Sequence, residues 1–220
     1  MKKLIALALI VLMLIPFAAC ANTNNSATPD EAAEPTTTNT TTATPSAEVD
    51  PNGAVRGKTV NYVYTNSFCG VTFTADKTWS FDPDSSLAAK DGITEDALSN
   101  QNLQTTIKGN GVACDVYAQK IVDNKSKAMF TLSYVNGEDP FIKDKSIEEF
   151  VDMLAADTGI DVSTAKTENV AYGGRAFCRI TFETKEKTTI VAACRINDVI
   201  VTIAASATKD SGVDFAEILK

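Results

Sequence analysis

Few residues in this 220-residue chain could do chemistry, because the sequence contains five cysteines and no histidine. The absence of histidine excludes Ser-His-Asp and Cys-His nucleophilic sites and any zinc site that needs imidazole. Ser206 and Lys209 have the S-x-x-K spacing of some hydrolases, but the first falls late in a predicted strand and the second in a turn. We therefore expect no catalytic residues, no metal site and no cofactor, and keep a histidine-independent hydrolase as an alternative.

The cysteines that follow the first one are Cys69, Cys114, Cys178 and Cys194. No two of them have the C-x₂₋₄-C spacing of a metal knuckle, so disulfides are the other chemistry to consider in an exported protein. Cys178 and Cys194 have the same parity on predicted strands joined by a turn near Glu186, and a hairpin centred there would place them opposite each other. The alternatives are a Cys178–Cys194 bridge, a Cys69–Cys114 bridge, which no turn geometry supports, or free thiols packed as small hydrophobes.

The N-terminus has the layout of a secretory signal. Two lysines precede an apolar run over residues 4–15, and small residues lead to Cys20. The run is at the short edge of the roughly 20 residues that a bilayer span needs. The sequence "FAAC" (residues 17–20) resembles the lipobox of bacterial lipoproteins, in which the cysteine thiol receives a diacylglyceryl group and becomes the new N-terminus.

The lipobox resemblance implies a signal peptide over residues 1–19, lipid attachment at Cys20 and a place on the extracytoplasmic face of a bacterial membrane. An uncleaved anchor, or cleavage that leaves Cys20 free, are the alternatives. Residues 20–55 are then predicted to form a tether, because the segment from Ala21 to Asp50 is rich in Thr, Asn, Ala and Pro and has no aromatic or basic residue. Such a segment cannot offset its ordering entropy by apolar burial, so we expect disorder. Its Thr/Asn-rich composition favours a Gram-positive surface.

Residues 56–220 remain for one globular domain. They contain 18 basic and 23 acidic residues, a net charge near −5. Because phosphate binding depends on clustered Lys and Arg, we expect neither nucleic acid nor an anionic lipid surface as a partner of this domain.

Hydrophobic periodicity predicts an α+β domain. The clearest helix covers residues 146–159, with Ser146 and Glu149 forming a capping box; others are expected within residues 95–108 and in the C-terminal "VDFAEILK". Strands are predicted over residues 60–65, 68–75, 112–121, 128–135, 162–170 and three times between 175 and 207, with a hairpin turn at Asn197-Asp198. The last three strands are apolar on both faces, so the sheet needs cover on both sides.

The segment "YTNSFCGVTFTADKTWSF" (residues 64–81), the "VAYGGRAF" turn and the closing "EILK" resemble lipoprotein domains of the PsbP-like fold over roughly residues 60–220. The resemblance implies a layered α/β/α sandwich on a central antiparallel sheet. Members of this fold mostly act as binding or assembly factors, and no functional residue can be carried over.

We therefore predict a membrane-anchored cell-envelope lipoprotein whose domain is a non-enzymatic binding or scaffolding module. Its partner would be another envelope protein or an extracellular ligand. An accessory solute-capturing lipoprotein is the other alternative, although one domain lacks the two lobes that usually close on a solute.

Overall fold

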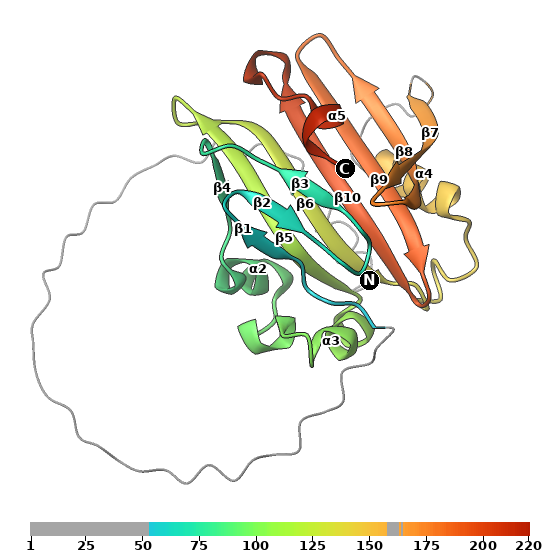
Figure 1. The fold of residues 1–220 in the computed structure, drawn as a ribbon. Coiled ribbons are helices and arrows are strands. Elements are labelled where there is room, and N and C mark those ends of the chain that lie inside the picture. Colours follow the sequence, from blue (N-terminus) through green and yellow to red (C-terminus); the bar gives the residue numbers. More distant parts are fainter. Residues whose placement is uncertain (1–52, 158–162, 164) are drawn as a thin grey trace, which may run out of the picture.

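The computed structural model describes residues 53–157, 163 and 165–220. Its central element is a seven-stranded antiparallel sheet with the strand order β4-β5-β6-β10-β9-β8-β7 (Figure 1). The strands are β4 (Trp79–Phe81), β5 (Val112–Val122), β6 (Lys125–Asn136), β7 (Lys166–Tyr172), β8 (Arg175–Glu183), β9 (Lys187–Ile196) and β10 (Val199–Thr208).

Two-residue turns join three pairs of these strands. They lie at Asp123-Asn124, Gly173-Gly174 and Asn197-Asp198, as the strand registers show. Positive φ angles at Asp123, Asn124, Asn197 and both glycines match the twist of the strands that these turns connect. The predicted hairpin at Asn197-Asp198 is confirmed.

The first face of the central sheet is covered by a small three-stranded sheet and by helices. The small sheet contains β1 (Lys58–Val60), β2 (Val63–Thr65) and β3 (Thr72–Thr74), and it lies in front of β5 and β6 in Figure 1. Phe73 of β3 stacks on Phe130 of β6, with ring centroids 4.2 Å apart. The helices of this layer are α2 (Asp84–Asp91), the 3₁₀ turn η1 (Glu95–Leu98), α3 (Leu103–Asn110), the 3₁₀ turn η3 (Lys209–Ser211) and α5 (Phe215–Ile218).

The second face carries helix α4 (Ile147–Asp157), which packs on β8 and β9. Phe150, Val151 and Leu154 are buried against apolar residues of these strands. The predicted capping box is confirmed: the Glu149 amide donates to Ser146 Oγ at 3.1 Å, and the Ser146 amide donates to the Glu149 carboxylate at 2.8 Å. With cover on both faces of an antiparallel sheet, the predicted α+β layered class is confirmed.

Several predicted elements differ from the structure. The predicted strand over residues 60–65 is interrupted, because Asn61 and Tyr62 adopt positive φ and form the turn between β1 and β2. The predicted helix within residues 95–108 is interrupted, since η1 ends at Leu98 and α3 starts only at Leu103. Hydrophobic periodicity does not indicate helix α2, because its apolar positions are few.

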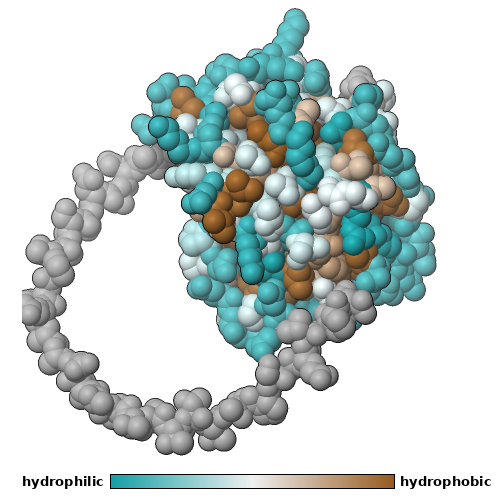
Figure 2. Space-filling model, viewed as in Figure 1, coloured by the Kyte–Doolittle hydropathy of each residue, from teal (hydrophilic) through white to brown (hydrophobic). Residues whose placement is uncertain are grey.

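The globular part begins earlier than residue 56. Ala54 is buried in the core of the first face, and the backbone of Val55 is bonded to the domain. No helix within the ranges 53–157 and 165–220 is long and apolar enough to cross a bilayer. On the face seen in Figure 2, apolar side chains form separate patches among hydrophilic ones.

Candidate functional site

The most unusual group of the first face is a buried carboxylate, Asp115, on strand β5. The register of β5 against β6 shifts between Cys114, which pairs with Ser133, and Val116, which pairs with Leu132. Asp115 is therefore the extra residue of a β-bulge, a feature that redirects a side chain and disturbs the ladder locally. The bulge allows the carboxylate to face the small sheet, in a strand that otherwise buries apolar residues.

Side chains from several elements donate hydrogen bonds to Asp115. Arg56 Nε lies 2.6 Å from Oδ1, and the Asn66 amide nitrogen lies 2.7 Å from Oδ2. The Tyr64 hydroxyl donates to Oδ2, and the Gly57 backbone amide lies 3.0 Å from the same oxygen. We call Arg56, Gly57, Tyr64, Asn66, Asp115 and Tyr134 the Asp115 cluster.

The Asp115 cluster holds the first described residues of the chain. The Val55 carbonyl accepts from the Tyr134 hydroxyl at 2.6 Å, which is closer than the 3.2 Å from this hydroxyl to Asp115. The backbone amides of Ala54 and Arg56 donate to Gln104 Oε1 at 3.1 Å and Asn100 Oδ1 at 2.6 Å. Side chains rather than a strand ladder thus satisfy the backbone of residues 54–57.

Only glycine fits at position 57, because the backbone there lies close to the ring of Tyr64. A Cβ atom at this position would overlap the ring of Tyr64, whose hydroxyl donates to Asp115. The backbone of residue 57 can therefore reach the carboxylate only without a side chain.

The electrostatics of the cluster keep its hydroxyls protonated. Burial, and then the negative charge of Asp115, raise the pKa of Tyr64 and of Tyr134 well above the ordinary value. Burial acts to lower the pKa of Arg56, but the charges of Asp115 and Asp84 outweigh it and raise this pKa. Arg56 is thus a permanent cation between a buried carboxylate and the exposed Asp84, whose Oδ1 lies 2.8 Å from Arg56 Nη2.

The cluster can hold a chain segment, but it presents no reactive group to a substrate. Its carboxylate is buried and saturated with donors, and its tyrosines are buried as well. Acidic residues that the sequence brings near each other are also engaged: Asp82 pairs with Lys90 at 2.6 Å, and Asp91 accepts from the Cys114 amide at 2.6 Å. Among the described residues, no three His, Cys, Asp or Glu side chains gather as metal ligands.

The cysteine geometry corrects the predicted hairpin register. Cys178 pairs with Ala193 rather than with Cys194, so the register assumed for the bridge is off by one residue. A shift of one residue places the two thiols on opposite faces of the sheet, Cys178 under α4 and Cys194 in the first-face core. The structure therefore does not form the predicted Cys178–Cys194 bridge, and all four described cysteines are buried free thiols.

Burial also makes these thiols poor nucleophiles. It raises the pKa of Cys69, Cys114 and Cys194 to about 12, and raises the pKa of Cys178. The other predicted site residue, Cys20, lies outside the described residues, as do the signal peptide and most of the predicted tether.

The loop that follows Asn66 meets the β7–β8 turn through glycines. Gly70 and Gly173 both have positive φ, and a Cβ atom at Gly173 would overlap the carbonyl of Gly70. Gly70 and Gly173 therefore make a backbone-to-backbone contact that leaves no room for a side chain at position 173.

Sequence reasoning did not identify the Asp115 cluster. A signal was present, since "VACDVYAQKI" places one carboxylate within an apolar strand, where an unpaired charge is costly. Its partners Arg56, Tyr64, Asn66 and Tyr134 are spread over the sequence without a motif. Only the tertiary structure brings them together.

Comparisons with known proteins add little to this description. No protein-family model matches the chain, and no curated protein is similar to it. Among solved structures, the chain is similar to the solution structure of cyanobacterial PsbP (CyanoP) from Synechocystis sp. PCC 6803, with a TM-score of 0.36 and 11% sequence identity, over 73% of this chain and 89% of that chain. A likeness at this level carries no argument about function, and the fold class stated above rests on the structure itself.

Proposed function

We propose that this protein is a lipid-anchored lipoprotein of the bacterial cell envelope, and that its domain is a non-enzymatic module that binds another envelope protein. Cys20 would carry the acyl chains, on the extracytoplasmic side of the membrane, and the polar segment after it would act as the tether. The anchor is inferred from the lipobox resemblance.

The observation that carries the proposal is the way residues 54–57 are held. Residues 54–57, which cover the end of the predicted tether and the start of the predicted domain, are bonded to side chains of the Asp115 cluster and around α3. An attachment of this kind suits a domain that is held through its N-terminus, because any load from the tether acts on several long-range hydrogen bonds and not on a fraying end.

A binding role is also favoured by how the reactive groups are used. The thiols are buried, and the cluster carboxylate is saturated by internal donors. General acid–base or nucleophilic work needs a group that reaches the substrate.

The anchor is tested by Cys20→Ser in the native host. The wild-type chain should carry acyl mass and fractionate with the membrane, and the Ser variant should lose both. Cys178→Ser is the matched control, because it removes a thiol that cannot be the anchor. A wild-type chain without fatty acid would contradict the anchor.

The binding role is tested by crosslinking in intact cells, followed by mass spectrometry of captured proteins. One envelope protein recovered reproducibly with wild-type chain would support the proposal. A ligand-dependent rise in melting temperature against a metabolite panel would favour solute capture instead, and turnover in an activity screen would favour a hydrolase.

A further inference from the structure

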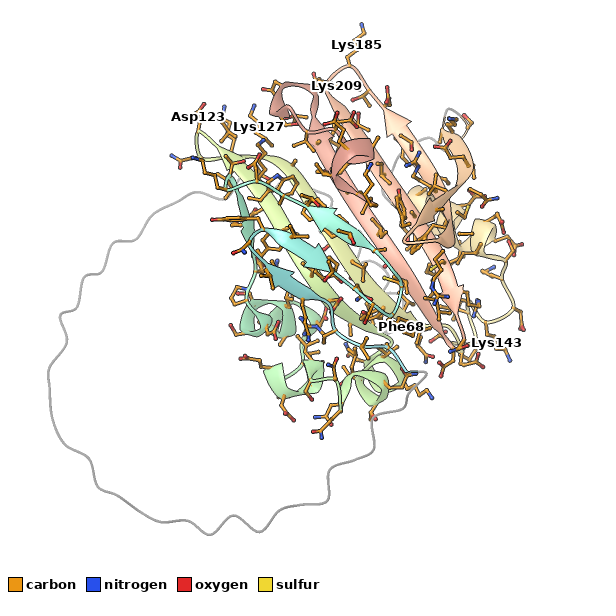
Figure 3. All side chains as sticks on the ribbon, viewed as in Figure 1. Phe68, Asp123, Lys127, Lys143, Lys185 and Lys209 are labelled. Carbon is orange, nitrogen blue, oxygen red and sulfur yellow. The ribbon has the colours of Figure 1, made fainter. Side chains whose placement is uncertain are left out.

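Two hairpin tips and the connection between β3 and β4 meet at one end of the central sheet. They consist of residues 58–62, 75–78 and 120–127, which we call the tip cluster. The Ala75 amide donates to the Tyr62 carbonyl at 2.9 Å, and Lys120 Nζ lies 3.6 Å from Asp76. Figure 3 labels Asp123 and Lys127 at this end, and Phe68 and Lys143 at the opposite end.

Exposed apolar side chains concentrate in the tip cluster. Among the described residues, the exposed large hydrophobic ones are Val60 (65%), Tyr62 (44%), Ile121 (46%) and Phe141 (67%). All but Phe141 belong to the tip cluster. Single exposed hydrophobic residues need no explanation, but their concentration at one end of a domain indicates a contact surface.

The backbone of Tyr62 is strained. Asn61 and Tyr62 have φ angles of 50° and 65°, in a two-residue turn where glycine is usual at the second position. A bulky residue with positive φ costs free energy, and such outliers concentrate at functional sites. The strain supports a role for the exposed aromatic ring that glycine could not perform.

The charge of the tip cluster is opposite to that of the domain. The cluster contains five lysines and two aspartates, a net charge of +3, within a domain of net charge near −5. Three of these lysines form no ion pair with any described side chain: Lys58, Lys77 and Lys125. Lys127 does form one, since its Nζ lies 2.5 Å from Asp210 Oδ2. Asp210 lies outside the tip cluster, and its negative charge is balanced by the positive charge of the adjacent Lys209.

We propose that the tip cluster rests on the anionic surface of a lipid bilayer, with Tyr62 and Val60 at headgroup depth and the lysines near the lipid phosphates. Tyrosine favours this depth because its ring is apolar and its hydroxyl is polar. Each lysine near an anionic leaflet adds to the attraction. The domain's average charge, which argues against such a contact, conceals this local patch.

The inference rests on the proposed anchor, which would hold the tip cluster near a bilayer. The chain enters the domain at the opposite end. There Gln104 accepts a hydrogen bond from the Ala54 amide and donates one to the Asp198 carboxylate in the β9–β10 turn. A strand of ten residues is about 33 Å long. The 32 residues between Cys20 and Gly53 reach about 105 Å at most, enough to pass along the sheet.

The test uses the full acylated chain in vesicles of phosphatidylglycerol and phosphatidylcholine that contain a headgroup quencher. A fluorophore is attached at Ser126→Cys in the tip cluster or at Phe141→Cys at the opposite end. Labelling is selective because the four native thiols of the described domain are buried. We expect stronger quenching at position 126 than at position 141.

Two sets of variants are then compared in the Ser126→Cys background. The lysine variants are Lys58→Gln, Lys77→Gln and Lys125→Gln. Each should lower the equilibrium constant for contact between the tip cluster and the bilayer about fivefold. Tyr62→Gly should reduce quenching while leaving the melting temperature unchanged or raised, since it also relieves the strained φ. Lys143→Gln is the control at the opposite end and should change nothing.

High salt should weaken the contact, because the screening length falls from about 10 Å at 0.1 M to about 3 Å at 1 M. Equal quenching at both ends of an acylated chain would overturn the proposal, as would quenching at position 126 that does not respond to the lysine variants. A chain without acyl mass would instead overturn the anchor, so the two failures are distinguishable.

Discussion

The side-chain amide nitrogen of Asn66 lies 2.7 Å from the carboxylate of Asp115, although 49 residues separate them in the sequence. The other end of the same amide accepts hydrogen bonds from the backbone of Phe68 and Cys69. Asn66 therefore connects the buried carboxylate to the loop that meets the β7–β8 turn at Gly173. One side chain thus bonds both to the buried carboxylate and to the backbone of this loop.

Removing the charge of Asp115 should destabilise the domain strongly. Asp115→Asn leaves Arg56 without its buried partner, and breaking a buried ion pair costs about 3 kcal/mol or more. Asp84→Asn is the control, because Asp84 is exposed and pairs with the same guanidinium; its loss should cost under about 1 kcal/mol. Urea denaturation of both variants measures the difference, and equal losses would contradict a central role for Asp115.

The contact between Gly70 and Gly173 predicts a difference between neighbouring glycines. Gly174→Ala should cost about 1 kcal/mol, since its φ is positive but nothing lies near the added methyl group. Gly173→Ala should cost about 2 kcal/mol more, because the methyl group would overlap the Gly70 carbonyl. Thermal unfolding of the pair tests this, and similar melting temperatures would argue against the close approach.

Asp91 should make the domain less stable as the pH rises from about 4 to about 6. Burial raises the pKa of Asp91 to about 6, although the Cys114 amide acts to lower it. The folded chain therefore keeps a proton that the unfolded chain has released, so the free energy of unfolding falls across this window by up to about 3 kcal/mol. Above about pH 6, Asp91 is ionised in both the folded and the unfolded chain, so its effect on the free energy of unfolding no longer changes with pH.

The Asp91→Asn variant isolates this effect. Subtracting its unfolding free energy from that of the parent at each pH should leave a curve that declines between about pH 4 and pH 6 and is flat above. The amide oxygen of the variant can still accept from Cys114. A difference curve that does not change with pH would show that Asp91 titrates alike in both states.

The native thiols should resist modification. Because burial raises the pKa of Cys69, Cys114 and Cys194 to about 12, almost no thiolate exists at pH 8. A thiol reagent should therefore modify these cysteines only after denaturation, and mass spectrometry without reduction should find no bridge among the described cysteines. Rapid labelling of the folded chain at any of the three would contradict this burial.

The sequence predicted those elements whose signals are local. Helix α4 has both an apolar stripe and the Ser146–Glu149 capping box. The Asn197-Asp198 dipeptide favours a two-residue hairpin turn, however the flanking strands pair. The hairpin register around Cys178 could not be predicted to one residue, because β9 is apolar and buried on both faces, so its pattern does not show which of its residues lies opposite Cys178. The β1–β2 turn was hidden because Tyr62 occupies a position where glycine is usual.

The sequence by itself determined the composition of each part: an apolar N-terminal run followed by Cys20, a polar segment that lacks core residues, and an α+β domain with no histidine. These are properties of neighbouring residues and need no long-range contact. Only the tertiary structure decided that Cys178 and Cys194 face opposite sides, that Asp115 is enclosed by partners from three separate segments, and that lysines and exposed apolar residues meet at one end. Each depends on strand register or on a bulge, whose free energy comes from packing between residues far apart in the chain.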